Sequence, residues 1–110
     1  MLTKKRPPRV KTNTILQSTP CYAKAIFIVT NDKGLHTRPS AELVKCATNF
    51  KAEVSLEHQD LTVNAKSLLG VLTLAASRGS RISIEATGED AEIAVQTILD
   101  LAEKKFYIHY

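Results

Sequence analysis

The chain has 110 residues, of which 44% are hydrophobic, and its formal net charge is +4. This length suits one domain with a modest core, and no apolar run is long enough for a membrane span or a signal peptide. Cys21 and Cys46 have no metal-ligand spacing and form no disulfide framework. We therefore expect a cytoplasmic protein without membrane insertion, metal or cofactor.

The positive charge is concentrated in residues 1–22. Five of the 15 Lys and Arg residues lie there without any acidic residue, so residues 23–110 carry ten basic and 11 acidic side chains. The basic stretch contains prolines and shows no sustained period, which predicts a flexible arm, or alternatively an arm that contacts an anionic surface weakly. The remainder has no basic face of the kind that a nucleic-acid-binding domain presents, so we expect no nucleic acid as a partner.

Residues 23–110 are expected to form one domain with the element order β-α-β-β-α-β-α. Apolar or alternating segments predict four strands, at residues 23–29, 53–58, 61–65 and 81–86. Apolar residues at helical spacing predict three helices, at about residues 37–49, 68–76 and 91–105. The pattern predicts an α+β fold in which a four-stranded antiparallel sheet carries three helices on one face and leaves the other face open.

The open face of this sheet is expected to be polar, with one exception. Ile26 and Ile28 alternate with core residues and should point outward. We expect Val10, Ile15 and Leu16 of the arm to cover this apolar pair, or two molecules to associate there.

One histidine, His36, stands where a helix is expected to begin. Gly34 supplies a turn before it, and Pro39 fits a first helical turn because its missing N–H costs nothing there. Helix N-termini favour anions, and neutral imidazole can carry a phosphoryl group as a covalent nucleophile. The predicted site therefore consists of His36 as acceptor, with Arg38 and the backbone N–H of Thr37 contacting the phosphoryl oxygens. Without these neighbours His36 would be interpreted as a capping residue with no chemistry.

Two segments at this separation, Gly34–Pro39 (GLHTRP) and Asn64–Leu72 (NAKSLLGVL), resemble the histidine-containing phosphocarrier protein HPr family of the bacterial phosphoenolpyruvate-dependent sugar phosphotransferase system. Gly79 and the segment Gly88-Glu89-Asp90 extend the resemblance, which covers about residues 23–106. It implies an HPr-like open-faced β-sandwich and a phosphoryl carrier, not an enzyme. It also implies that His36 accepts the group on Nδ1, as pros-phosphohistidine, from Enzyme I and passes it to sugar-specific IIA domains during sugar uptake.

Ser67 has two interpretations. Its position before an apolar helix predicts an N-cap hydroxyl. The resemblance also matches it to the serine that HPr kinase/phosphorylase modifies in many bacteria, which makes regulation at Ser67 a hypothesis. The residues matched to the family's partner-contacting surface are Leu68, Leu69, Leu72 and Thr73. Lys45 and Lys66 are expected to steer acidic partners, and the protein is expected to be a monomer.

The chain departs from the family pattern at several positions. Lys33 stands where a small polar residue is common, which affects hydrogen bonding near His36. Three positions that are basic in some members are Thr48, Leu61 and Gly70, so the electropositive rim is thinner here. The basic arm lies outside the pattern.

Three alternative functions remain open. One is a regulatory HPr paralogue that signals phosphorylation state without feeding sugar uptake. A second is a nucleic-acid-binding module that uses the basic arm. A third is a small hydrolase with His36 as general base, although the sequence shows no nucleophile or carboxylate to partner it. Cys46 is expected to be inert, and His58 and His109 are expected to be surface residues.

Overall fold

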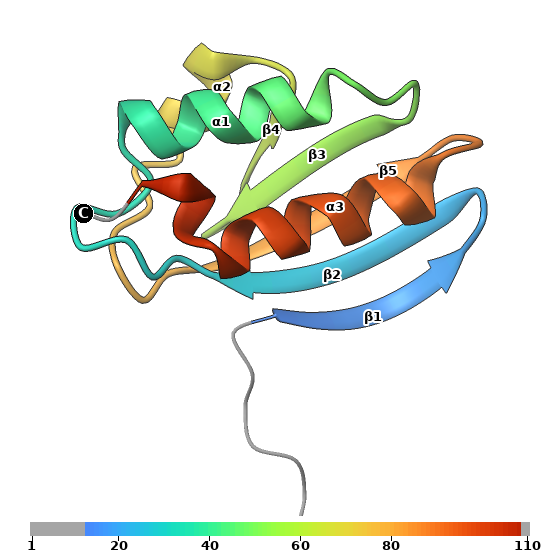
Figure 1. The fold of residues 1–110 in the computed structure, drawn as a ribbon, viewed down its shortest axis with the longest axis horizontal. Helices are drawn as coiled ribbons and strands as arrows, with labels where there is room; N and C mark the ends of the chain where they lie inside the picture. Colours follow the sequence, from blue (N-terminus) through green and yellow to red (C-terminus); the bar gives the residue numbers. More distant parts are fainter. Residues whose placement is uncertain (1–12, 109–110) are drawn as a thin grey trace, which may run out of the picture.

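The computed structural model describes residues 13–108, which form a single sheet with helices packed on it (Figure 1). In chain order the elements of this part are β1 (Asn13–Thr19), β2 (Tyr22–Ile28), α1 (Thr37–Ala47), β3 (Glu53–His58), β4 (Leu61–Asn64), α2 (Leu68–Thr73), β5 (Arg81–Thr87), α3 (Ala91–Glu103) and the 3-10 turn η1 (Lys105–Tyr107). The strands lie in the order β1-β2-β5-β3-β4, and every neighbouring pair is antiparallel.

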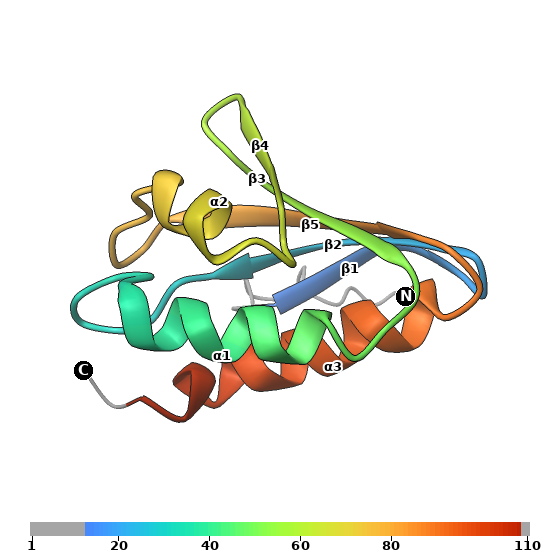
Figure 2. The same ribbon diagram turned by 90° about the horizontal axis from the view of Figure 1, so that it is seen from above.

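α1 and α3 lie side by side against one face of the sheet, and α2 packs beside α1 and β4 (Figure 2). The alternation of the strands explains this layering. Along β3 and β5 every second side chain is buried, including Leu56 and Ile84, whereas Glu57 and Glu85 between them face solvent. Burial of one set of side chains under the helices provides the main stabilising free energy. The predicted α+β fold with an open polar face is therefore confirmed.

The predicted strand count is wrong, because residues from Asn13 onward form a fifth strand. β1 pairs with the outer edge of β2, with Thr14 opposite Ile26 and Ile15 opposite Ala25. A register shift between Ile15 and Gln17 breaks the two-residue alternation, so the segment has no clean strand period. The flexible-arm prediction is thus wrong for the last part of residues 1–22. Residues 1–12, with the basic cluster and Val10, lie outside the described residues.

The prediction that the arm lies across Ile26 and Ile28 is also wrong for the described residues of the arm. Ile15 lies in β1, which pairs with the edge of β2, and its partner in that pairing is Ala25. Ile26 and Ile28 are half-buried. A further contact ties β1 to the helical layer, where the Ser18 hydroxyl donates to the Glu92 carboxylate at 2.6 Å.

The helices end earlier than their apolar periodicity predicts. α2 stops at Thr73, and the chain reverses through Ala75, which has a φ of 50°. α3 stops at Glu103, and the three residues of η1 have φ values of 55°, 55° and 64°. This left-handed turn carries Phe106 into the core, where its ring meets that of Phe27 edge to face at 6.0 Å. Burial of an aromatic ring thus overrides continuation of the helix.

Candidate functional site: the N-terminus of α1

His36 is the N-cap residue of α1. Its backbone is extended, with φ −80° and ψ −167°, and its carbonyl accepts the Ser40 N–H at 3.0 Å to begin the helix. The imidazole makes no capping hydrogen bond to the helix, and the residue is partly exposed. The interpretation of His36 as a capping side chain is therefore wrong, and this partly exposed residue stands at the positive end of the helix dipole.

The loop before His36 is held tightly against the turn after α2. Gly34 has a φ of 72°, and a Cβ there would lie 2.4 Å from the Ala76 carbonyl oxygen and 2.8 Å from the Ser77 Cα. The next residue, Leu35, donates its N–H to the Ala76 oxygen at 2.8 Å, and its own carbonyl accepts the buried Ser40 hydroxyl at 2.9 Å. Only glycine tolerates this conformation at this close approach, so Gly34 sets the position of His36.

The residues after His36 form the first turn of α1. Thr37 and Arg38 are exposed, whereas Pro39 is buried against the core. First-turn N–H groups have no acceptor inside the helix, and no acidic side chain lies in this turn. The three predicted site residues His36, Thr37 and Arg38 thus lie together at one exposed helix end, where an anion would be stabilised.

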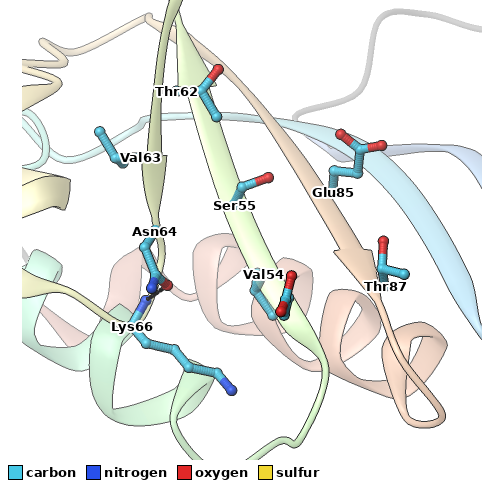
Figure 3. Close-up of a pocket in the computed structure, with 9 residues that line it drawn as sticks. Val54, Ser55, Thr62, Val63, Asn64, Lys66, Glu85 and Thr87 are labelled. Atoms are coloured by element: carbon cyan, nitrogen blue, oxygen red, sulfur yellow. Dashed lines mark hydrogen bonds between the residues drawn. The ribbon is translucent and has the colours of Figure 1, made fainter.

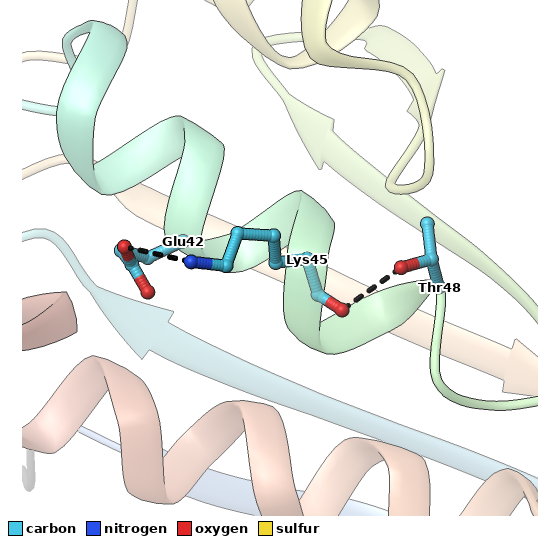
Figure 4. Close-up of polar contacts among 3 residues, drawn as sticks. All are labelled: Glu42, Lys45 and Thr48. Atoms are coloured by element: carbon cyan, nitrogen blue, oxygen red, sulfur yellow. Dashed lines mark hydrogen bonds and ion pairs between the residues drawn. The ribbon is translucent and has the colours of Figure 1, made fainter.

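Lys45 lies near the other end of α1. Its ammonium group is 3.4 Å from the Glu42 carboxylate, and its carbonyl accepts the Thr48 hydroxyl at 2.9 Å (Figure 4). Lys45 stands roughly 12 Å from Thr37 along the axis, at 1.5 Å per residue. It therefore makes no part of the site at His36, and an exposed pair of this kind contributes at most about 1 kcal/mol.

Ser67 is the N-cap of α2, as predicted. Its hydroxyl oxygen accepts the N–H of Gly70 at 3.0 Å. A Cβ on Gly70 would lie 3.3 Å from that oxygen, so any side chain at this position would crowd the cap. The cap hydroxyl is partly exposed.

The apolar helix α2 exposes part of its surface. Leu69 is 74% exposed and Leu68 is 38% exposed, whereas Val71 is fully buried. Leu72 is half-buried, and Thr73 is exposed with its hydroxyl donated to the Gly70 carbonyl. An apolar side chain as exposed as Leu69 marks a contact surface more often than a core position.

Lys66 is held in place, in contrast to Lys45. Its ammonium group donates to the Phe50 carbonyl at 2.7 Å, and its main-chain N–H donates to the Asn64 side chain at 2.8 Å. The side chain borders a shallow hollow at the end of β3, β4 and β5, which is also lined by Glu53 and Thr87 (Figure 3). Lys66 therefore supplies a positive charge at a fixed position.

The structure also shows contacts that the sequence does not indicate. Arg78 forms an ion pair of 3.3 Å with Asp32 in the loop before His36. Asp90 accepts the main-chain N–H groups of Lys51 and Ala52, both at 2.8 Å, and the bond from Lys51 is the main reason that the pKa of Asp90 is lowered. No local sequence signal predicts these pairs, because the partners are 38 or more residues apart.

The remaining candidate residues can be placed as follows. Burial raises the pKa of the Cys46 thiol, which disfavours the reactive thiolate. His58 is partly exposed, and its Nδ1 lies 3.1 Å from the Leu74 carbonyl oxygen. His109 lies outside the described residues. Lys33, Thr48 and Leu61 are exposed.

Two features are absent from residues 13–108. In that part of the chain no three His, Cys, Asp or Glu side chains are grouped as metal ligands. The same residues contain no helix with the length and apolarity needed to span a bilayer.

A partly exposed histidine at the N-terminus of a helix that packs on an open-faced antiparallel sheet has the chemistry of a phosphoryl carrier. The model for the phosphorylation site of the phosphotransferase system HPr component matches residues 23–104. Phosphocarrier protein HPr of Xylella fastidiosa strain 9a5c is 43% identical over 80 residues, which is 73% of this chain and 90% of that protein. The chain therefore belongs to the HPr family of phosphocarrier proteins.

Solved structures agree with this assignment. HPr-C-His from Thermoanaerobacter tengcongensis superposes with a TM-score of 0.75 at 34% identity, covering 79% of this chain and 98% of that one. HPr from Bacillus anthracis strain Ames superposes with a TM-score of 0.69 at 37% identity, covering 72% and 94%. The family match begins at residue 23, so β1 precedes it.

Proposed function

We propose that this protein accepts a phosphoryl group from Enzyme I on His36 and passes it to sugar-specific IIA domains. The observation that carries the proposal is the placement of His36, which is partly exposed at the N-terminus of α1 and does not use its imidazole to cap the helix. In this role the protein is a substrate of other proteins and turns nothing over itself. Its place of action would be the cytoplasm, as a monomer.

The proposed transfer step is a nucleophilic displacement at phosphorus. The lone pair of Nδ1 attacks phosphorus, and the bond from phosphorus to the donor breaks with its electron pair left on the donor. The Thr37 N–H and the Arg38 guanidinium then contact the phosphoryl oxygens by charge-assisted hydrogen bonds. The exposure of the site keeps the phosphohistidine open to solvent and partners, which favours onward transfer.

The docking surface proposed for both partners is the exposed part of α2 with the flanking lysines. Leu68, Leu69, Leu72 and Thr73 supply the contact, with Leu69 the most exposed of the three leucines. Lys45 and the anchored Lys66 supply positive charge that steers acidic partners. A carrier must leave each partner quickly, so a small and transient interface is expected here.

Ser67 is the proposed regulatory position, with an HPr kinase/phosphorylase as its partner. The Ser67 hydroxyl is partly exposed and adjoins Leu68 and Leu69 in the chain. A phosphate on it would place negative charge next to the apolar contact surface, and desolvation of that charge would weaken docking.

The proposal is tested by incubating the protein with phosphoenolpyruvate and Enzyme I. We expect an acid-labile, base-stable phosphoryl group that is absent from His36→Ala and retained in the matched control His58→Ala. Retention of the group in His36→Ala would overturn the assignment of the acceptor. Acceptance without onward transfer to any IIA domain would favour a regulatory paralogue, and salt-sensitive nucleic-acid binding that is lost with residues 1–12 would favour the module alternative.

A further inference from the structure

Asn31 is a buried polar residue that the proposed transfer mechanism does not use. It lies five positions before His36, and its side chain is fully buried. Its carbonyl accepts the N–H of Gly34 at 2.9 Å, which closes the turn that leads to His36. Burial of an amide side chain in a small core is unfavourable unless its hydrogen bonds are made.

The Asn31 side chain is bonded to the end of the chain. Its Nδ2 donates to the Lys105 carbonyl at 3.1 Å and to the Ile108 carbonyl at 2.7 Å. Lys105 is the first residue of the left-handed turn η1 and Ile108 follows the turn. All three residues of η1 have positive φ. Non-glycine residues keep such a conformation only where their surroundings enforce it. Asn31 and the burial of Phe106 supply that enforcement.

The loop between β2 and α1 is therefore held from two sides. On one side Leu35 bonds the Ala76 carbonyl, and on the other Asn31 bonds the C-terminal turn. η1 also packs against α1, the helix whose N-cap position is occupied by His36. Figure 1 shows the chain returning after α3 to the end of the molecule where this loop lies.

We propose that Asn31 is a positioning residue for phosphoryl acceptance, which it serves by tying the C-terminal turn to the loop that carries His36. The inference rests on the proposed carrier function. In this role Asn31 acts through the backbone of residues 31–36. Asparagine suits the role because one amide nitrogen has two N–H donors for two carbonyls.

Two substitutions separate the hydrogen bonds from the space that the side chain fills. Asn31→Asp keeps the shape and presents an oxygen to both carbonyls, whereas Asn31→Ala removes the group. Ile98→Val and Ile98→Ala are the controls, because Ile98 is buried on α3 and its truncation lowers stability without changing the loop. Each variant is made in the full chain.

Two readouts are measured on these variants. The first is hydrogen exchange of the Gly34 and Leu35 amides, whose bonds hold the loop. The second is kcat and KM for phosphorylation by Enzyme I with the carrier as substrate. For both Asn31 variants we expect faster exchange at these two amides and a kcat lowered about tenfold or more with KM nearly unchanged, since misplaced reacting groups lose up to about 100-fold. Both Ile98 variants should keep the wild-type kcat under folding conditions.

The proposal would be overturned if the Asn31 variants matched Ile98 variants of equal stability in both readouts, the hydrogen exchange of the Gly34 and Leu35 amides and the kcat with Enzyme I. If neither Asn31→Asp nor Asn31→Ala folds, Asn31→Ser is measured instead, because it keeps one donor and is expected to show the same changes at smaller size. Failure of the wild type to accept a phosphoryl group would end the proposed function, while amide exchange would still decide whether Asn31 holds the loop.

Discussion

The main-chain N–H of Leu35 donates to the carbonyl of Ala76 at 2.8 Å, and this bond joins the loop that carries His36 to the turn that follows α2. The histidine and the exposed apolar helix, proposed as the phosphoryl site and the docking surface, are therefore fixed to one another. A partner that contacts α2 would meet His36 in a defined position, which reduces the entropy lost in reaching the reactive geometry.

The close approach at Gly34 predicts a large effect of adding one methyl group. Gly34→Ala should lower the free energy of unfolding by the cost of a left-handed alanine, about 1–2 kcal/mol, and by a further amount for the clash with the Ala76 carbonyl. Gly79→Ala is the matched control, because Gly79 also has positive φ but, apart from Gly79 itself and its two chain neighbours, no atom of residues 13–108 lies within 4 Å of where its methyl group would stand. Urea unfolding measures both, and equal losses would contradict a role for the contact.

Removal of the Arg38 side chain should affect transfer and not folding. Arg38 is exposed, so Arg38→Ala should unfold at the same urea concentration as the wild type. Phosphoryl transfer should slow by about 1.5–3 kcal/mol in activation free energy, the value of a hydrogen bond to a charged group. Arg78→Ala, which removes an exposed arginine paired with Asp32, serves as control. Wild-type transfer in Arg38→Ala would remove this residue from the mechanism.

Substitutions at Ser67 can separate the effect of a negative charge at this position from the effect of losing the helix cap. Ser67→Ala should cost about 1 kcal/mol of stability through loss of the bond to the Gly70 N–H. Asn and Asp both cap helices well, so Ser67→Asn and Ser67→Asp should retain stability. Only Ser67→Asp adds a negative charge beside Leu68, and it alone should raise the KM for Enzyme I. Identical KM values for the two capping variants would count against regulation by charge.

The Asp90 carboxylate should make the free energy of unfolding depend on pH in the acidic range. Its pKa is lowered mainly by the Lys51 N–H bond, so the folded state binds a proton less readily than the unfolded state. The stabilisation is complete above the usual aspartate pKa of about 3.9 and is lost as pH falls through the lower folded value. When pH is lowered below about 4, the free energy of unfolding measured in urea should therefore fall less for Asp90→Asn than for the wild type. Parallel pH profiles would show that the two backbone bonds do not stabilise the carboxylate form.

The added strand β1 predicts an effect on association. Deletion of residues 1–19 removes β1 and leaves the edge of β2 with unpaired backbone groups, which favours pairing between molecules. Deletion of residues 1–12 leaves β1 in place and is the control. Light scattering and binding of a hydrophobic dye should increase in the first variant alone. If both deletion variants kept a monomer mass and unchanged dye binding, β1 would not be what protects the edge of β2 from association.

Much of the fold follows from local sequence patterns. The alternation around Leu56 and Ile84, the N-cap at Ser67 and the helix start at His36 each depend on residues within one or two turns, so the sequence by itself determined them. The segments Gly34–Pro39 and Asn64–Leu72 are each equally local, and together they indicate the family to which the chain belongs.

Tertiary structure alone decided the pairing of β1 with β2, the burial of Asn31 and the left-handed turn that places Phe106 against Phe27. β1 is an edge strand with an irregular register, so its partner stabilises it more than its own pattern does. Asn31 and its acceptors are 74 and 77 residues apart. Such bonds depend on which surfaces meet when the sheet and helices pack, and hydrophobic periodicity carries no information about that meeting.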